Sequence, residues 1–406
     1  MEEWKEYKLG ELSIGKGSYG IGASAVPYSP SLHTYLRITD INDDGTLNKN
    51  GLMSLDDENA DDYILQPNDI VFARTGNSTG RSYFYDGSDG ELVYAGFLIK
   101  FSLDSAKVNP RILKYYTHSK PYFDWVRSFD TGGTRGNINA KTYGDMPIVL
   151  PPRKLQDKIV SILKSLDDKI EVNRKINENL EQQAQALFKS WFVDFEPFKN
   201  GEFVDSELGM IPKGWIIKSL SEIADYVNGL AMQKYRPEDG EIGLPVLKIK
   251  ELGQGGFDTN SELCSPSLIG EKYIINDGDI IFSWSGTLMV KIWCGGKCGL
   301  NQHLFNVVAK DYPNWFAYQW TRHHLDNFIR IAKDKAVTMG HIKRGELDKA
   351  KVLIPERHQM NTISDIMKPI HLQMISNELE SRRLAELRDT LLPKLMSGEL
   401  KVNEIA

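Results

Sequence analysis

Short apolar runs separated by turn-forming residues fill two long stretches of this chain. The runs are rich in β-branched and aromatic residues and are bounded by Gly, Asn, Asp and Pro, a pattern that predicts strands joined by tight turns. The clearest predicted strands are DIVFA (69–73), LVYAGFLIKFSL (92–103), DIIFSW (279–284) and LFNVVA (304–309). Short helical patterns occur at 111–127 and 314–332. Both stretches therefore predict mixed α+β domains.

A different pattern follows each of these stretches. From Leu155 to Phe192 there is no Gly and no Pro, and apolar residues recur at alternating intervals of three and four, which predicts a long helix with a narrow apolar seam. The seam residues are Leu163, Leu166, Ile170, Leu180, Leu187 and Trp191. Residues 356–396 repeat the pattern through Ile363, Ile366, Ile370, Leu384, Leu391 and Leu395. Pro369 is expected to kink or break this second helix, and Pro393 to disturb its last turns.

Two long helices with matching seams most simply pair with each other as an antiparallel coiled coil. Asn173 and Asn177 occupy intervening seam positions, and polar seam residues help to fix the register of such a pair. The alternative is two unrelated amphipathic helices, each lying on its own domain.

The whole plan occurs twice in the chain. YLRITDINDDG (35–45) matches VLKIKELGQGG (246–256), YILQPNDIVFARTG (63–76) matches YIINDGDIIFSWSG (273–286), and VLPPRKLQ (149–156) matches VLIPERHQ (352–359), always in the same order. Such repetition indicates a duplicated unit. The predicted parts are a first α+β domain (1–152), a first long helix (153–196), a linker (197–214), a second α+β domain (215–354), and a second long helix with a tail (355–406). The fold class is thus α+β with an internal pseudo-twofold repeat.

Composition adds little to this picture. The chain has 406 residues, 41% of them hydrophobic, and a net charge of −6, which is ordinary for a globular protein. Three cysteines suit a reducing compartment, and neither an apolar leader nor a membrane span is visible, so we expect a cytoplasmic protein.

The motifs of common catalytic sites are missing from the sequence. A glycine-rich cofactor loop after a strand and the Pro-Pro-aromatic tetrad of amino methyltransferases are not found. GKGSYGIG (15–22) lacks the Lys-Ser/Thr pair of a phosphate-binding loop. Cys294, Cys298 and His303 lack the paired spacing of a structural zinc site and have no counterpart in the first copy. We therefore expect neither a metal nor a cofactor on this chain.

Polar and basic loops follow strands at equivalent places in the two copies. Guanidinium, amide and hydroxyl groups on such loops are suited to contacts with DNA bases and phosphates. The candidate DNA contacts in the first copy are Arg74, Thr75, Asn77, Thr79, Arg81, Thr134, Arg135, Asn137, Asn139 and Lys141. Those in the second copy are Trp284, Ser285, Thr287, Thr338, His341, Lys343 and Arg344.

The residues also carry a resemblance to a known family, the specificity subunits of Type I restriction–modification systems. SELGMIPKGW (206–215), NQHLF (301–305), VTMGHIKRGELDKAKVLIP (337–355), KSWFVDFEP (189–197) and LRDTLLPKLMSGEL (387–400) carry this resemblance, and with the doubled plan they span nearly the whole chain.

The resemblance implies a non-catalytic subunit that reads a split target in double-stranded DNA, with one domain for each half-site and the helices setting the gap. It also implies two modification subunits, which carry the adenine methyltransferase chemistry and S-adenosylmethionine, and restriction/translocase subunits that use ATP with Mg. The alternative function is a protein-interaction scaffold that uses its paired helices without reading bases.

Overall fold

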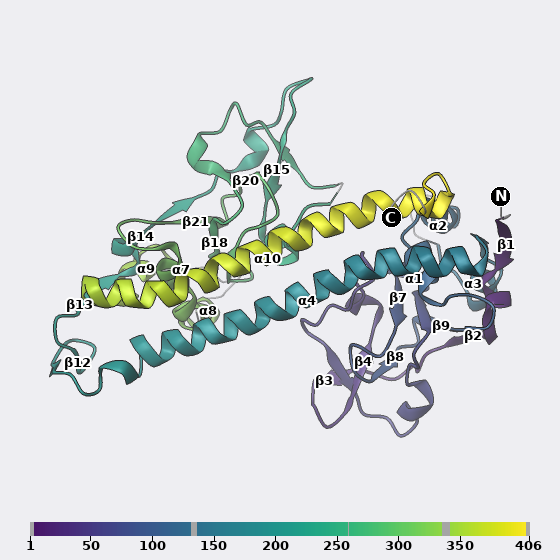
Figure 1. Ribbon diagram of the computed structural model, residues 1–406, viewed down its shortest axis with the longest axis horizontal. Coiled ribbons are helices and arrows are strands. Elements are labelled where there is room, and N and C mark those ends of the chain that lie inside the picture. The colour runs from purple at the N-terminus through teal and green to yellow at the C-terminus, as the bar shows by residue number, and fades with distance from the viewer. Residues whose placement is uncertain (1–3, 131–135, 259, 335–341, 403–406) are drawn as a thin grey trace. The chain divides into compact units, whose positions relative to one another are not determined.

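The repeat in the sequence is also a repeat in the fold. The computed structural model describes residues 4–130, 136–258, 260–334 and 342–402. The chain forms two compact units: the first joins the residues up to Asp167 to those from Glu386 onward, and the second comprises Asp168–Ala385. Each unit contains short strands, short helices and a part of each of two long helices (Figure 1). The predicted α+β class with two similar domains is confirmed, but the division between the units falls inside the long helices.

The first unit is built on an antiparallel sheet, a mixed sheet and a two-stranded ribbon. The strand orders are β2-β9-β6-β7, β3-β5-β4-β8 and β1-β10. The strands are β1 (Lys5–Lys8), β2 (Ser13–Tyr19), β3 (Val26–Pro27), β4 (His33–Leu36), β5 (Met53–Leu55), β6 (Asp69–Ala73), β7 (Ser82–Tyr85), β8 (Leu92–Tyr94), β9 (Leu98–Leu103) and β10 (Pro147–Leu150). The short helices are α1 (Arg111–Tyr116), α2 (Lys120–Arg127) and α3 (Ala140–Gly144).

The second unit repeats these sheets and adds a small hairpin. Its strand orders are β14-β21-β18-β19, β16-β15-β20-β17, β13-β22 and β11-β12. The strands are β11 (Phe203–Val204), β12 (Ile211–Pro212), β13 (Ile216–Ser219), β14 (Ala224–Asn228), β15 (Leu244–Leu247), β16 (Leu263–Cys264), β17 (Ile274–Ile275), β18 (Ile280–Ser283), β19 (Met289–Ile292), β20 (Cys298–Leu300), β21 (Leu304–Ala309) and β22 (Lys351–Ile354). The short helices are α5 (Leu220–Ile223), α6 (Ile249–Gln254), α7 (Asn314–His323), α8 (Leu325–Asp334) and α9 (Gly345–Lys349).

The prediction of one continuous strand at 92–103 is wrong. The apolar run 92–103 forms two strands, β8 and β9, which belong to different sheets. The chain turns between them, where the Leu98 amide donates a hydrogen bond to the Ala95 carbonyl at 2.8 Å. Because Gly96 has no Cβ, it fits beside the Ile21 carbonyl, which an added Cβ would approach to 3.3 Å.

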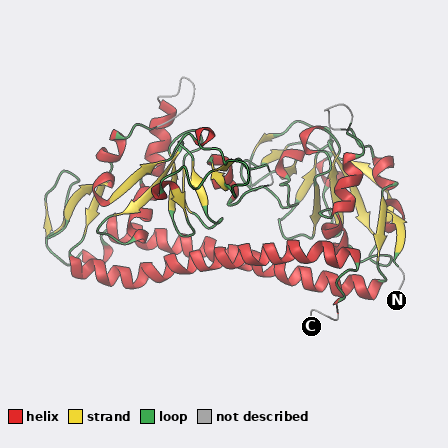
Figure 2. Ribbon diagram, turned by 90° about the horizontal axis from the view of Figure 1, so that it is seen from above, coloured by secondary structure: helices red, strands yellow, loops and turns green. Residues whose placement is uncertain are grey.

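The long helices are α4 (Arg153–Phe192) and α10 (Arg357–Ser397). Figure 2 shows both as uninterrupted ribbons. The break expected at Pro369 is therefore wrong, and the helix also continues through Pro393. Both prolines are exposed, so water can reach the backbone carbonyls left without a donor.

Contacts inside the second unit give the direction of the helix pair. Lys169 of α4 forms an ion pair with Glu380 of α10 at 3.0 Å. Two turns further along α4, the Asn177 side chain donates to the Met374 carbonyl at 3.0 Å, which lies earlier in α10. Residue numbers rise on one helix as they fall on the other, so the predicted antiparallel pairing is confirmed.

The seam of this pair is polar where the sequence places asparagine. Asn173 is 1% exposed, and its side-chain amide donates to Glu380 at 2.8 Å. The Asn377 amide donates to the Asn177 side-chain oxygen at 2.9 Å. Because sliding either helix by one turn breaks these bonds, they favour a single register. Asn377 was not predicted as a seam residue.

The helix ends are also built into the domain cores, so each long helix contributes to the core of each unit in addition to pairing with the other helix. In the first unit, Leu163 of α4 and Leu395 of α10 join a core that includes Phe72 and Tyr143. In the second unit, Phe188 lies edge-on against Trp320 of α7, with ring centroids 4.9 Å apart.

The other predicted seam residues follow the same division. Those in or against the domain cores are Leu187, Trp191, Ile363, Ile370 and Leu391. Those that are partly buried are Leu166, Ile170, Leu180 and Leu384. Ile366 lies outside the seam, because the inward-facing row of α10 passes through Ile363 and Met367, and its side chain is 46% exposed.

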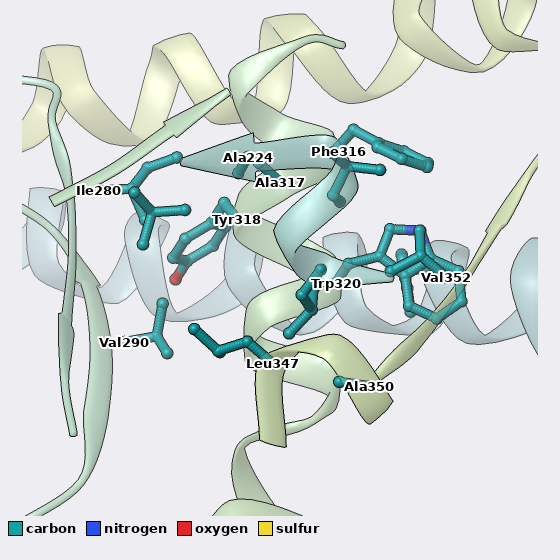
Figure 3. Close-up of a cluster of buried hydrophobic side chains, with 14 of the residues drawn as sticks. Ala224, Ile280, Val290, Phe316, Ala317, Tyr318, Trp320, Leu347, Ala350 and Val352 are labelled. Atoms are coloured by element: carbon teal, nitrogen blue, oxygen red, sulfur yellow. The ribbon is translucent and has the colours of Figure 1, made fainter. Parts of the chain in front are cut away.

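The core of the second unit surrounds helix α7. Phe316, Ala317 and Trp320 of this helix are buried beside Ile280 of β18 and Val290 of β19 (Figure 3). Aromatic side chains of this size each remove a large apolar area from water, so this core supplies much of the unit's stability.

A half-buried ion cluster joins three helices in the first unit. The Asp167 carboxylate of α4 accepts hydrogen bonds from Lys114 of α1 at 2.8 Å and from Arg388 of α10 at 3.0 Å. Burial alone would raise the pKa of Asp167, but the two cations outweigh it and hold the pKa below its ordinary value. The cluster thus ties both long helices to the first domain.

We expect His371 to make the second unit less stable in acid. This α10 side chain is 7% exposed beside Tyr318, and burial lowers its pKa from 6.5 to about 4. The unfolded chain binds the proton more readily, so this contribution to stability is intact above pH 6.5 and is lost as the pH falls toward 4. Replacing His371→Phe keeps an aromatic ring at this position. In denaturant titrations, wild type should lose about 2 kcal/mol more than the variant between pH 8 and pH 5. Equal losses would contradict this role.

Candidate nucleic-acid interface

Three strand ends meet at one edge of the antiparallel sheet in the first unit. β2 ends at Tyr19, Arg74 follows β6, and Phe97 precedes β9. Because β9 runs antiparallel to both neighbours, these ends lie at the same edge. The Arg74 amide donates to the Phe97 carbonyl at 3.1 Å, and the guanidinium carbon of Arg74 lies 5.0 Å from the centre of the Tyr19 ring. We call Tyr19, Arg74 and Phe97 the first edge triplet.

The second unit has the same backbone arrangement with different side chains. β14 ends at Asn228, Trp284 follows β18, and His303 precedes β21. The Trp284 amide donates to the His303 carbonyl at 3.4 Å, and the Trp284 indole N–H donates to the Asn228 side-chain oxygen at 3.1 Å. These residues are the second edge triplet.

A second loop is anchored at the same place in each unit. The Ile138 amide donates to the Arg74 carbonyl at 3.0 Å, and the Ile342 amide donates to the Trp284 carbonyl at 3.2 Å. Both isoleucine side chains are buried. The two candidate loops of each copy, far apart in the sequence, are therefore brought together beside the edge triplet of their unit.

Each edge depends on a glycine that follows the first member of its triplet. A Cβ added to Gly20 would lie 2.2 Å from the Tyr94 carbonyl oxygen, and one added to Gly229 would lie 2.2 Å from the Asn301 carbonyl oxygen. The strands approach so closely here that only glycine fits.

The loop after β6 divides into exposed and structural residues. Asn77 is exposed and Thr75 is half-buried. The Thr79 hydroxyl contacts the Gly76 and Gly136 carbonyls at 2.8 and 3.2 Å, so it joins the two loops. The Arg81 guanidinium donates to the Ile41 carbonyl at 3.1 Å and pairs with Asp43 at 2.7 Å. DNA contact by any of these four residues stays a prediction.

The next candidate loop is described only from Gly136 onward. Asn137 and Lys141 are exposed. Asn139 caps helix α3, its side-chain oxygen accepting from the Thr142 amide at 2.9 Å. Thr134 and Arg135 lie outside the described residues.

The second copy's candidates are similarly divided. Trp284 is half-buried, Ser285 is buried and Thr287 is exposed. Lys343 is exposed, whereas the Arg344 guanidinium donates to the Tyr226 carbonyl of β14 at 3.1 Å. Thr338 and His341 lie outside the described residues.

Sequence reasoning missed four of the six triplet residues, namely Tyr19, Phe97, Asn228 and His303. The internal repeat of the sequence could have pointed to these residues. Tyr19-Gly20 and Asn228-Gly229 occupy corresponding positions, and in each copy an exposed residue precedes a glycine that close packing requires.

A cavity of about 350 Å³ lies next to the second edge triplet. It is lined by Gln233, Lys248, Ile249, Lys250, Glu262, Asn301, Gln302 and His303. Lys248 is paired with Glu262 at 2.6 Å and Lys250 with Asp258 at 2.7 Å, so both lysines at its wall have carboxylate partners.

The described residues contain no group of three or more His, Cys, Asp or Glu side chains placed to hold a metal ion. All three cysteines are buried, and burial raises the pKa of Cys264 to about 11 and that of Cys294 to about 12, which keeps these thiols protonated at neutral pH. Within the described part of the chain, no helix is long and apolar enough to cross a membrane.

Comparison with known proteins gives the family. The model of the Type I restriction modification DNA specificity domain matches residues 1–182 and 212–388. The MjaIX specificity subunit of Methanocaldococcus jannaschii, a Type I restriction enzyme subunit, is 29% identical over 72% of this chain and 69% of its own length. The HindI specificity subunit of Haemophilus influenzae is 23% identical over 98% of this chain and 100% of its own length.

A crystal structure of the S subunit of a Type I restriction–modification system from M. genitalium is 15% identical, with a TM-score of 0.49 over 97% of this chain and 96% of that one. The sequence matches alone carry the assignment. Because the family model matches both copies of the repeat, this chain belongs to the family of Type I restriction modification DNA specificity domains.

Proposed function

We propose that this chain reads a split target in double-stranded DNA, with one edge triplet and its neighbouring loops facing each half-site. The observation that carries the proposal is that both units hold three strand ends in the same backbone arrangement but with different side chains. The same backbone arrangement would let both edges approach the duplex in the same way. The different side chains would let them read two different base sequences. The family assignment supports this function.

The paired helices are the part that would set the gap between the half-sites. α4 has 40 residues and α10 has 41, so each is about 60 Å long if straight. Successive major-groove sites on one face of DNA are about 34 Å apart. Helices of this length, locked in register by the asparagine seam, are adequate spacers.

The chemistry would belong to other subunits. We propose that two modification subunits bind this chain and bring S-adenosylmethionine, and that restriction/translocase subunits with ATP and Mg join them. This chain would bind no cofactor itself and would position the methyltransferase over its target.

The isolated chain should bind DNA weakly. Residues 1–152 hold 15 Lys and Arg against 20 Asp and Glu, so the first domain lacks the excess cations that give strong attraction to phosphates. We expect nanomolar affinity at physiological salt only after modification subunits are added, measured by fluorescence anisotropy over a range of salt concentrations. Nanomolar specific binding by the chain alone would contradict this expectation.

The same titration separates the two functions considered. Sequence-dependent binding by the assembled complex that weakens steeply with salt supports a reader. Assembly with partners but no preference among DNA sequences would support the scaffold without base readout.

A further inference from the structure

Arg74 differs from the other described arginines of the first domain. Between residues 4 and 130, every other arginine has a carboxylate nearby. These pairs are Arg37–Asp40 at 2.7 Å, Arg81–Asp43 at 2.7 Å, Arg111–Asp86 at 2.6 Å and Arg127–Asp124 at 3.7 Å. Arg74 has no ion pair with any described residue, and its Nε is buried without a hydrogen-bond partner among them. Such an unpaired guanidinium retains its hydrogen-bonding capacity for a ligand.

The structure also holds Arg74 in place. Its backbone is fixed on both sides, by the Phe97 carbonyl and the Ile138 amide. Its guanidinium lies over the Tyr19 ring, and the Tyr19 hydroxyl accepts from the Ala140 amide at 3.1 Å, which fixes the ring in turn. A cation held by an aromatic ring loses less freedom when it binds, because it is already oriented.

The surroundings of Arg74 favour a base edge over a phosphate. Phe97, whose carbonyl binds the Arg74 amide, is 58% exposed. A phenyl ring offers a phosphate neither a charge nor a hydrogen-bond donor, but it can contact the methyl group of thymine or the edge of a base. The planar fork of arginine matches the two acceptors of guanine, O6 and N7, in the major groove.

We propose that Arg74 reads a guanine in the first half-site, with Tyr19 as its positioning residue and Phe97 contacting the neighbouring base. This inference rests on the proposed function. The second unit has Trp284 at the equivalent position, and its indole N–H is bonded to Asn228. At this backbone position, therefore, only the first unit has a side chain that can recognise guanine.

The test is to map the target of the assembled methyltransferase complex by sequencing methylated DNA, with wild type and three variants of this chain. Arg74→Lys keeps the charge and loses the fork, Arg74→Ala loses both, and Arg127→Lys is a matched control at an exposed arginine. Arg74→Lys should relax one guanine in one half-site, lowering discrimination there roughly 10- to 100-fold, and leave the other half-site unchanged. Arg127→Lys should retain the wild-type target. Thermal unfolding and partner binding of each variant confirm that it is folded.

Three other outcomes would contradict either the inference about Arg74 or the proposed function. A target unchanged in both Arg74 variants would overturn the inference and leave the proposed function intact. Weaker binding to all sequences by Arg74→Ala, with a salt dependence reduced by about one ion and no relaxed position, would assign Arg74 to a phosphate and also overturn it. A wild-type complex with no split target would refute the proposed function itself.

Discussion

Deleting one heptad from each long helix is expected to shorten the gap between the half-sites by about three base pairs or to abolish specific binding. Seven residues span about 10 Å of helix, and base pairs are spaced about 3.4 Å apart. The deletion should remove 174–180 from α4 together with 370–376 from α10, because these segments face each other in the antiparallel pair. Asn173 keeps its contacts with the Asn377 carbonyl and Glu380, whereas the bonds of Asn177 to Met374 and Asn377 are removed with the deleted segments.

The helix faces change little in this variant apart from the loss of Ile370 and His371, which pack in the second unit, so thermal unfolding must first show that the variant is folded. A heptad is close to two full turns, so the residues beyond the deletion rotate by only about 20° about the helix axis. A second variant that lacks 174–180 alone is the comparison, because it leaves 370–376 of α10 without its facing segment and should destabilise the chain. Target mapping of the assembled complex measures the gap. An unchanged gap in the matched deletion would show that the helices do not set it.

Gly20→Ala and Gly229→Ala should each abolish recognition of one half-site and spare the other. The new methyl group would lie 2.2 Å from a backbone carbonyl oxygen in either unit, and no flexible side chain can yield the space. Overpacking of this kind typically costs about 1–3 kcal/mol, and here it displaces the strand end that carries Tyr19 or Asn228. The measurement is half-site preference, determined by competition between DNA duplexes altered in one half.

The chain offers matched controls for both variants. A Cβ at Gly22 or at Gly256 would meet no atom within 4 Å, so Gly22→Ala and Gly256→Ala test the loss of glycine without the clash. These controls should keep both half-sites. Loss of both half-sites in Gly20→Ala alone would contradict the independence of the two edges.

The long helices could be predicted because their signal is local and repetitive. The regular three-four spacing from Leu163 to Trp191, with no Gly or Pro, defines a helix whatever its surroundings. The continuation of α10 through Pro369 could not be predicted, because it depends on which side of the helix meets water. Likewise, Gly96 lies inside an apolar run that reads as one strand, and only the two separate sheets show that the chain turns there.

Only part of the candidate interface could be predicted from the sequence. Arg74 and Trp284 were found because they follow strongly predicted strands. Tyr19 and Phe97 were missed because their contact with Arg74 depends on the strand order of the sheet, which periodicity does not reveal. The ion pair of Arg81 with Asp43 was hidden for the same reason, since its partner lies on a separate loop.

The most direct test of the account is the methylation pattern of DNA treated with the complex of this chain and its modification subunits. We predict one split target with two different specified halves and an unspecified gap of constant length, and no methylation by either component alone. A continuous target, or methylation without sequence preference, would contradict the assignment of one half-site to each edge triplet.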